Sequence, residues 1–205
     1  MNSNNSKIPS RSMVVKYLEE AKMNNKGPWD QHSLCVGEAA RLIASKCPDL
    51  DNDLAYVLGA LHDIGRREGV SHMHHVISGY NFMKQEGYDK VARICLTHSF
   101  PNQEIHEYFG ERDCSFEELE FIEDYITNVE YDDYDKLIQL CDTLSLTTGY
   151  CLMEKRMIDV ALRYGVSEYT QEKWKACFSI KEYFENKIGT SIYNILPNVI
   201  ENTFE

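Results

Sequence analysis

The sequence has no long apolar run. No stretch approaches the ~18 to 20 apolar residues that a membrane helix requires. Residues 1–10 are polar and rich in Asn and Ser, with none of the apolar segment of a secretory signal. We therefore expect a cytoplasmic protein that does not associate with membranes, and we interpret residues 1–10 as a disordered lead-in.

Positive charge is also scarce, because 21 Lys and Arg stand against 33 Asp and Glu, for a net charge of −12. Binding to a nucleic acid polymer needs basic patches, so this balance argues against such a partner. A small anionic substrate is still compatible with the sequence, since bound cations or a few local arginines can reverse the potential at one site.

The seven cysteines form no C-x-x-C pair, and their number is odd. A disulfide framework and a zinc ribbon are therefore poor interpretations. Most of the cysteines lie in apolar surroundings, such as Ile94-Cys95-Leu96. We interpret them as reduced residues that pack in the core.

Alternation of β-branched and polar residues is nearly absent, and helical periodicity takes its place. Four apolar stripes have helical spacing: His32, Val36, Ala39, Ala40 and Ile43; Leu54, Val57, Leu58 and Leu61; Val91, Ile94, Cys95 and His98; and Leu137, Leu140, Cys141 and Leu144. With no internal repeat or long linker, this pattern predicts a single all-α domain over residues 11–200.

Local signals place some of the helix boundaries. Ser115 and Glu118 form a capping-box pattern, which predicts a helix that starts directly after Ser115. Further helices are expected over residues 152–164 and 170–187. Residues 99–114 make a long connection, which is either a lid over a site or a surface loop that carries a short helix.

Histidine and aspartate extend these apolar stripes. His32, His62 and His98 continue or end a stripe, and Asp63 follows His62 directly. Burying so many imidazoles and carboxylates without partners would be unfavourable. A shared metal removes the difficulty, because it supplies positive charge and accepts neutral imidazole nitrogens. Asp142 lies in another apolar run, where the alternative interpretation is a single structural salt bridge.

The order His32, His62-Asp63, Asp142 resembles the signature of the HD superfamily of metal-dependent phosphohydrolases. The resemblance covers roughly residues 29–145. It implies a single helical bundle of the HD-domain type, continued by a helical extension after about residue 150. It also implies that these four side chains hold one divalent metal.

Some members of that superfamily carry two more histidines and hold two metals. Their third histidine often stands four positions before a glycine, as His75 does before Gly79, and their fourth precedes Ser or Thr, as His98 does. The resemblance thus implies two divalent ions per chain (Fe, Mn, Mg or Zn), bridged by Asp63. A single metal is the alternative.

Other histidines compete for these roles. His74 and His72 are alternatives to His75, which the glycine spacing favours. His106 lies in a polar segment and is expected to be unligated. The pattern resembles small bacterial HD phosphatases that cleave dinucleoside polyphosphates, and also HD domains that hydrolyse cyclic dinucleotides.

The resemblance implies hydrolysis of a phosphate ester or anhydride of a small nucleotide or related metabolite. Asp63 and Arg66 are the candidate catalytic residues: Asp63 as the bridging ligand, and Arg66 as a contact to substrate phosphate. Relatives often have lysine at the position of Arg66, which puts a specific substrate in doubt. Arg67 is expected to be surface charge.

Two other functions remain open: a metal-retaining regulatory or ligand-sensing module, and a di-iron oxygenase of the HD type. The ligand set is intact, which favours the enzyme. After Gly149 there is no recognisable motif. Aromatic residues there could stack on a base, although we expect helical aromatics to be core: Tyr150, Tyr164, Tyr169, Trp174 and Tyr183. A homo-oligomer is compatible with the sequence.

Overall fold

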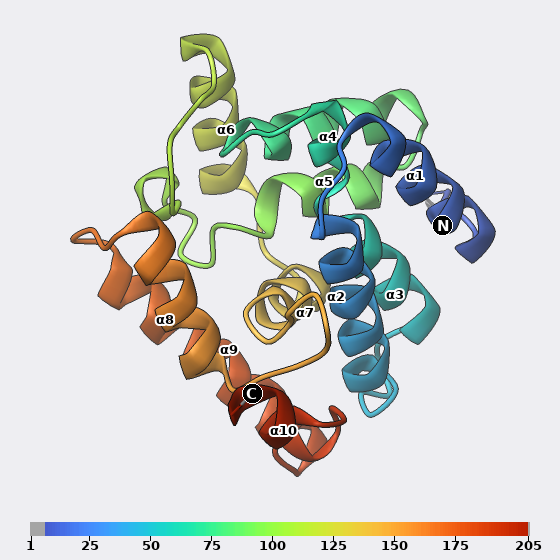
Figure 1. Cartoon of the computed structure of the whole chain (residues 1–205), viewed down its shortest axis with the longest axis vertical. Helices are drawn as coiled ribbons and strands as arrows, with labels where there is room; N and C mark the ends of the chain where they lie inside the picture. Colours follow the sequence, from blue (N-terminus) through green and yellow to red (C-terminus); the bar gives the residue numbers. More distant parts are fainter. Residues whose placement is uncertain (1–6, 205) are drawn as a thin grey trace.

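The chain folds into helices joined by short connections in this computed structural model, which describes residues 7–204 (Figure 1). The α-helices are α1 (Arg11–Asn24), α2 (Trp29–Ala44), α3 (Asn52–Leu61), α4 (His74–Gln85), α5 (Asp89–Thr97), α6 (Phe116–Asn128), α7 (Asp133–Asp142), α8 (Met153–Tyr164), α9 (Thr170–Ile188) and α10 (Val199–Phe204). Three 3-10 helices, η1 (Ile64–Glu68), η2 (Ile105–Glu107) and η3 (Ile192–Asn194), lie between them. Residues 7–204 contain no strand and one isolated bridge, between Ser145 and Tyr150. The all-α prediction is confirmed.

The core is built from the predicted stripes. All members of the four stripes are buried, and the apolar ones on α2, α3, α5 and α7 belong to one large cluster. The capping box is also confirmed, since Ser115 caps α6 and exchanges hydrogen bonds with Glu118. Of the predicted lead-in, residues 1–6 lie outside the described part of the chain, and Ser10 caps α1 by accepting from Met13 N. Among residues 7–204, no helix has both the length and the apolar character of a membrane span.

Two pairs of glycines let backbones touch where the site is formed. A β-carbon on Gly37 of α2 would lie 2.8 Å from the carbonyl oxygen of Tyr56 of α3, and one on Gly59 would lie 2.8 Å from Gly37 Cα. A β-carbon on Gly65 of η1 would lie 1.9 Å from the carbonyl oxygen of His75, and 2.5 Å from Gly79 N. Helix α2 is thereby held against α3, and η1 against α4.

A buried carboxylate joins α5 to α7. Asp135 is fully buried in the first turn of α7 and accepts from Thr97 Oγ1 at 2.7 Å and from Arg93 Nε at 3.1 Å. Gln139, one turn later, donates to the carbonyl oxygen of Thr97 at 2.9 Å. These bonds fix the end of α5, and with it His98, relative to α7.

The C-terminal helices pack against the far side of α7. Helix α7 contacts α2 and α3 as well as α9, so it separates the N-terminal helices from the extension (Figure 1). The helices predicted over 152–164 and 170–187 are α8 and α9, with bounds within one residue of the prediction.

Candidate metal centre and adjoining cavity

The six side chains predicted as metal ligands meet in the interior of the bundle. They are His32 in the first turn of α2, His62 at the C-terminal end of α3, Asp63 next to it, His75 in the first turn of α4, His98 at the end of α5, and Asp142 at the end of α7. All are buried except Asp142, whose side chain is 29% exposed. The structure therefore brings the whole predicted set together from five helices.

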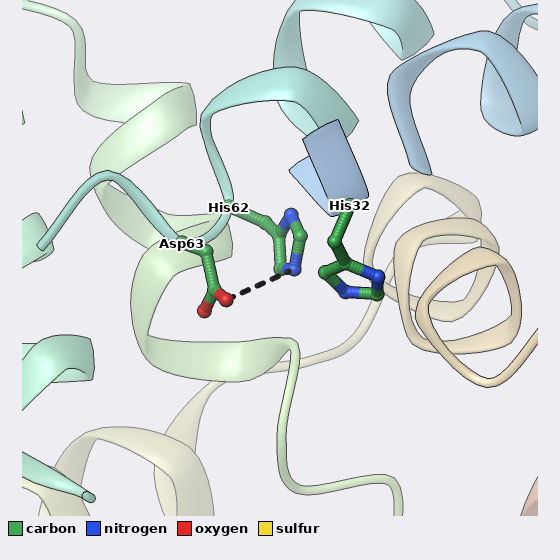
Figure 2. Close-up of side chains that lie close together, drawn as sticks. All are labelled: His32, His62 and Asp63. Carbon is green, nitrogen blue, oxygen red and sulfur yellow. Dashed lines mark ion pairs between the residues drawn. The ribbon is translucent and has the colours of Figure 1, made fainter. Parts of the chain in front are cut away.

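The first group is His32, His62, Asp63 and Asp142. His32 Nε2 lies 2.9 Å from Asp142 Oδ1, while His62 Nε2 lies 4.0 Å from the same oxygen and 3.9 Å from Asp63 Oδ2. Figure 2 shows His62 and Asp63 facing one another, with the ring of His32 beside them. Two ligands of one ion with bonds near 2.1 Å lie at most about 4.2 Å apart, so these separations suit a single ion.

The second group is Asp63, His75 and His98. Asp63 Oδ1 lies 3.0 Å from His75 Nε2 and 3.5 Å from His98 Nε2, and those two nitrogens are 3.4 Å apart. Asp63 thus presents Oδ2 to the first group and Oδ1 to the second. Asp63 is therefore the one residue that both groups share, and each group could hold a metal ion.

Backbone carbonyls fix how three of these imidazoles are protonated. His62 Nδ1 lies 2.7 Å from the carbonyl oxygen of Gly59, and His98 Nδ1 lies 3.0 Å from that of Cys95. His75 Nδ1 bonds the carbonyl oxygen of His72 in the same way. A carbonyl can only accept, so in each neutral ring the hydrogen is on Nδ1 and Nε2 carries a lone pair toward the centre.

These protonation states leave the centre short of positive charge. Burial lowers the pKa of His62 to about 4, and burial and then the charge of Arg66 lower the pKa of His75, so both rings are neutral near pH 7. The Nε2 lone pair of His75 then faces the Oδ1 atom of Asp63 with no hydrogen between them, and His98 Nε2 lies within 3.5 Å of both atoms. A bound divalent cation would satisfy all three, so the donor set fits a metal, although mixed N and O ligands do not decide which one.

Both carboxylates are ionised. For Asp63, burial opposes ionisation, but the charge of Arg66 lowers its pKa well below the usual range. For Asp142, burial likewise opposes ionisation, and the hydrogen bond from His32 lowers the pKa far below the usual range. Each can therefore act as an anionic ligand.

Helix α3 ends at Leu61, so Arg66 does not lie on it. Arg66 instead reaches the centre from the 3-10 helix η1. Its Nε donates to Asp63 Oδ2 at 2.6 Å, and Nη1 approaches the carbonyl oxygen of Ser71 at 3.4 Å. Arg66 also lines the adjoining cavity. Arg67 does not line it and packs over the ring of Phe82, 3.8 Å from the ring centre.

The remaining histidines face other partners. His74 Nδ1 lies 3.1 Å from Ser78 Oγ, and its Nε2 lies 3.4 Å from a Glu118 oxygen, so His75 is the one in the cluster. His72 contributes its carbonyl oxygen to His75 and does not line the cavity. His106 pairs with Glu104 at 2.7 Å, away from the cluster.

A cavity of about 870 Å³ opens directly onto the cluster. Five of the six clustered side chains line it, all but His62. The volume is within the range of small-molecule sites, roughly 300 to 1,000 Å³. The centre is therefore accessible to a metabolite-sized substrate.

Helices α8 and α9 supply a second set of lining residues, which we call the α8–α9 wall: Lys155, Arg156, Met157, Asp159, Val160, Leu162, Arg163, Tyr164, Lys173, Trp174 and Cys177. No sequence motif indicated this wall. The aromatics expected in the core divide: Tyr150 is buried there and Trp174 packs against that core, whereas Tyr164 and Tyr183 are exposed. Tyr164 and Trp174 also line the cavity. Basic and aromatic residues on an amphipathic helix are typical of a solvent-exposed face. No sequence signal therefore separated the residues of the α8–α9 wall from ordinary surface residues.

The connection over residues 99–114 has features of both interpretations. It carries η2, and it lines the cavity through Ser99, Pro101, Tyr108 and Phe109. Lys173 of α9 donates to the carbonyl oxygens of Ser99 at 2.8 Å and of Glu107 at 3.2 Å. The connection is thus fastened to the α8–α9 wall.

All seven cysteines are free thiols, and burial raises the pKa of each of them. The packing interpretation agrees with this environment.

The family model described as HD domain matches residues 29–147, more than half of the chain. The matched range contains all six clustered side chains and ends before the α8–α9 wall. No curated protein and no solved structure matches the chain significantly.

Proposed function

This chain belongs to the HD domain family, and on that premise we propose that it is an enzyme that hydrolyses a phosphate ester or anhydride of a small nucleotide or related metabolite, using two divalent metal ions. The observation that carries the proposal is the position of Asp63. It offers one oxygen to His62 and the other to His75 and His98, beside a cavity of metabolite size.

In this proposal each side chain has a distinct task. His32, His62 and Asp142 would hold one ion, His75 and His98 the other, and Asp63 both. When bound, such ions lower the pKa of a water molecule and polarise a phosphoryl oxygen. The carbonyls that bind each Nδ1–H keep the rings oriented, which is how outer partners support metal ligands.

Arg66 would orient Asp63 through Nε and neutralise substrate phosphate with the far edge of its guanidinium. Its Nη2 makes no hydrogen bond within the described residues, so a donor is left for an oxyanion. Arginine suits this role because its planar fork can bind two groups at once.

The cavity lining supports an organic phosphate with a flat group. Trp29, Tyr108, Phe109, Tyr164 and Trp174 all contribute to it. Aromatic side chains stack favourably on planar rings, and a nucleobase is such a ring. This supports the nucleotide part of the proposal.

The test is phosphate release from a panel of phosphorylated metabolites by metal-loaded protein, with elemental analysis of the same sample. We expect two ions per chain at saturation and turnover of at least one nucleotide; a plateau at one ion would make the centre mononuclear. Asp63→Ala should reduce turnover at least roughly a thousandfold, since it removes the shared ligand. Glu120→Ala, which removes an exposed carboxylate on α6 outside the cavity, should retain most of it.

Full turnover by Asp63→Ala would exclude hydrolysis at this centre. Assays with and without dioxygen separate hydrolysis from oxygenase chemistry, because only the latter consumes the gas. Absence of turnover over the whole panel, with metal bound, would favour a ligand-sensing module.

A further inference from the structure

The two tryptophans of the chain line the same cavity, but only one has a partner for its N–H. Trp29 Nε1 donates to the carbonyl oxygen of Asn25 at 3.0 Å. Trp174 Nε1 is buried and has no acceptor within the described residues. Buried indole N–H groups nearly always find a partner, so the acceptor for Trp174 is to be sought in what fills the cavity.

Two arginines of the cavity differ in the same way. Arg66 Nε is bonded to Asp63 at 2.6 Å, whereas Arg156 Nε is buried without an acceptor. Nor does Arg156 form an ion pair with any carboxylate among residues 7–204, although the chain carries 33 acidic residues. The residue as a whole is only partly buried, but a buried N–H without an acceptor has lost its hydrogen bond to water and gained none in return.

The α8–α9 wall around Arg156 carries more cations than carboxylates, and the charge of Arg156 also acts on Asp142 of the candidate metal centre. Lys155, Arg163 and Lys173 also line the cavity, and within the described residues none of them pairs with a carboxylate. Lys173 donates to two backbone carbonyls of the 99–114 connection. Asp159 is the only carboxylate of the α8–α9 wall. In a chain of net charge −12, this local excess of cations produces a region that attracts oxyanions.

We propose that Arg156 and Trp174 form a subsite for a second phosphate group of the substrate, a group that is not cleaved. The inference rests on the proposed function for the identity of the first phosphate, which lies at the metal centre. It narrows the substrate class to compounds with at least two phosphates, because a simple monoester would leave both buried donors unpaired.

The subsite can be tested without turnover. In a Trp29→Phe background, Trp174 is the single tryptophan, so its fluorescence reports on the subsite. Metal-free protein is titrated with inorganic phosphate, pyrophosphate and tripolyphosphate in the presence of a chelator. We expect saturable changes with these probes.

Arg156→Gln should weaken this binding roughly tenfold or more, since it removes a charge-assisted hydrogen bond. Arg112→Gln removes the same charge from an exposed position outside the cavity and should leave the affinity within about twofold. Trp174→Phe keeps the ring but loses the N–H, and calorimetry should show about fivefold weaker binding. If Arg156→Gln strongly lowers the melting temperature, Arg156→Lys is used in its place. Its affinity for the anion probes should be lower than that of the wild type but still measurable.

Equal affinities of the Arg156 and Arg112 variants would overturn the subsite, as would the lack of saturable binding for all three probes, which would mean that water alone fills the cavity. The proposed function is judged separately by phosphate release from metal-loaded protein. Anion binding that depends on Arg156 without any turnover would keep the subsite and reject the enzyme. If Arg156→Gln turns over bisphosphorylated substrates with an unchanged KM, the enzyme is kept and the subsite is rejected.

Discussion

Residues 29–147 and the helices after residue 150 line one cavity with opposite chemistry. The first region contributes imidazoles and carboxylates that already contact one another, down to 2.9 Å between His32 and Asp142. The second contributes donors that have no acceptor, at Arg156 and Trp174. The first region has an excess of lone pairs and needs cations, while the second has an excess of donors and needs an anion. Under the proposed function, a phosphorylated substrate bound together with metal ions would supply both.

Metal addition should give the largest effect that separates the two regions. At a thousandfold excess over Kd, binding to the native state adds about 4 kcal/mol, which corresponds to roughly 8 to 16 °C in Tm for a chain of this size. Differential scanning fluorimetry of metal-free protein with Mn²⁺ or Zn²⁺ measures it. His98→Gln should lose much of the gain and Arg156→Gln should keep it. An equal gain in both variants would contradict the separation of roles.

The second largest effect is expected where Gly65 approaches His75, within residues 29–147. Gly65→Ala places a β-carbon 1.9 Å from the carbonyl oxygen of His75, so η1 must move away from α4 and Asp63 with it. We expect a loss of about 3 kcal/mol in the free energy of unfolding, measured in urea. Gly27→Ala is the control, since its β-carbon would lie 3.4 Å from the Trp29 side chain, an ordinary contact. Similar stabilities of the two variants would show that the close approach does not position Asp63.

Acid should destabilise the metal-free protein through its buried imidazoles. Burial lowers the pKa of His62 from 6.5 to about 4. The contribution of the neutral ring to the free energy of unfolding is therefore complete above pH 6.5 and is lost as the pH falls toward 4. The loss at pH 5 is on the order of 2 kcal/mol for this group alone. Urea unfolding at pH 7.5 and pH 5 measures it, and His62→Gln should reduce the difference. A metal-free protein with the same stability at both pH values would refute the assignment.

The smallest expected effect concerns Arg66, which bonds Asp63 and lines the cavity. Arg66→Gln removes a charged contact to substrate phosphate, so KM should rise about tenfold. Metal content should stay normal, because Asp63 keeps both oxygens for ligation. Elemental analysis and steady-state kinetics measure the two quantities. Loss of metal from this variant would make Arg66 a structural partner of Asp63, and the phosphate contact would then lie elsewhere, with Arg156 the first candidate.

Some features missing from the sequence analysis had a signal there. Helix α1 was not predicted, although Val14, Tyr17, Leu18 and Ala21 have helical spacing and are all buried. The family resemblance includes the spacing of His75 from Gly79. The structure supplies a physical reason for this spacing, since Gly79 approaches Gly65 one helical turn after the histidine. Arg156 and Trp174 had no such signal, because an unpaired donor is a property of three-dimensional surroundings.

The sequence by itself determined the all-α class and the helices of the core, because burial of one face imposes a 3.6-residue period that can be read directly. It also indicated five candidate ligands, since histidine and aspartate stand out in or beside apolar stripes: His32, His62, Asp63, His98 and Asp142. The sixth, His75, rested on the glycine spacing of the family resemblance. The tertiary structure alone decided that His75 and not His74 joins the cluster, that Asp63 offers one oxygen to each group, and that α8 and α9 complete the cavity with unpaired donors. Such facts depend on side-chain direction and on contacts between distant segments, up to 110 positions apart for His32 and Asp142, which periodicity does not encode.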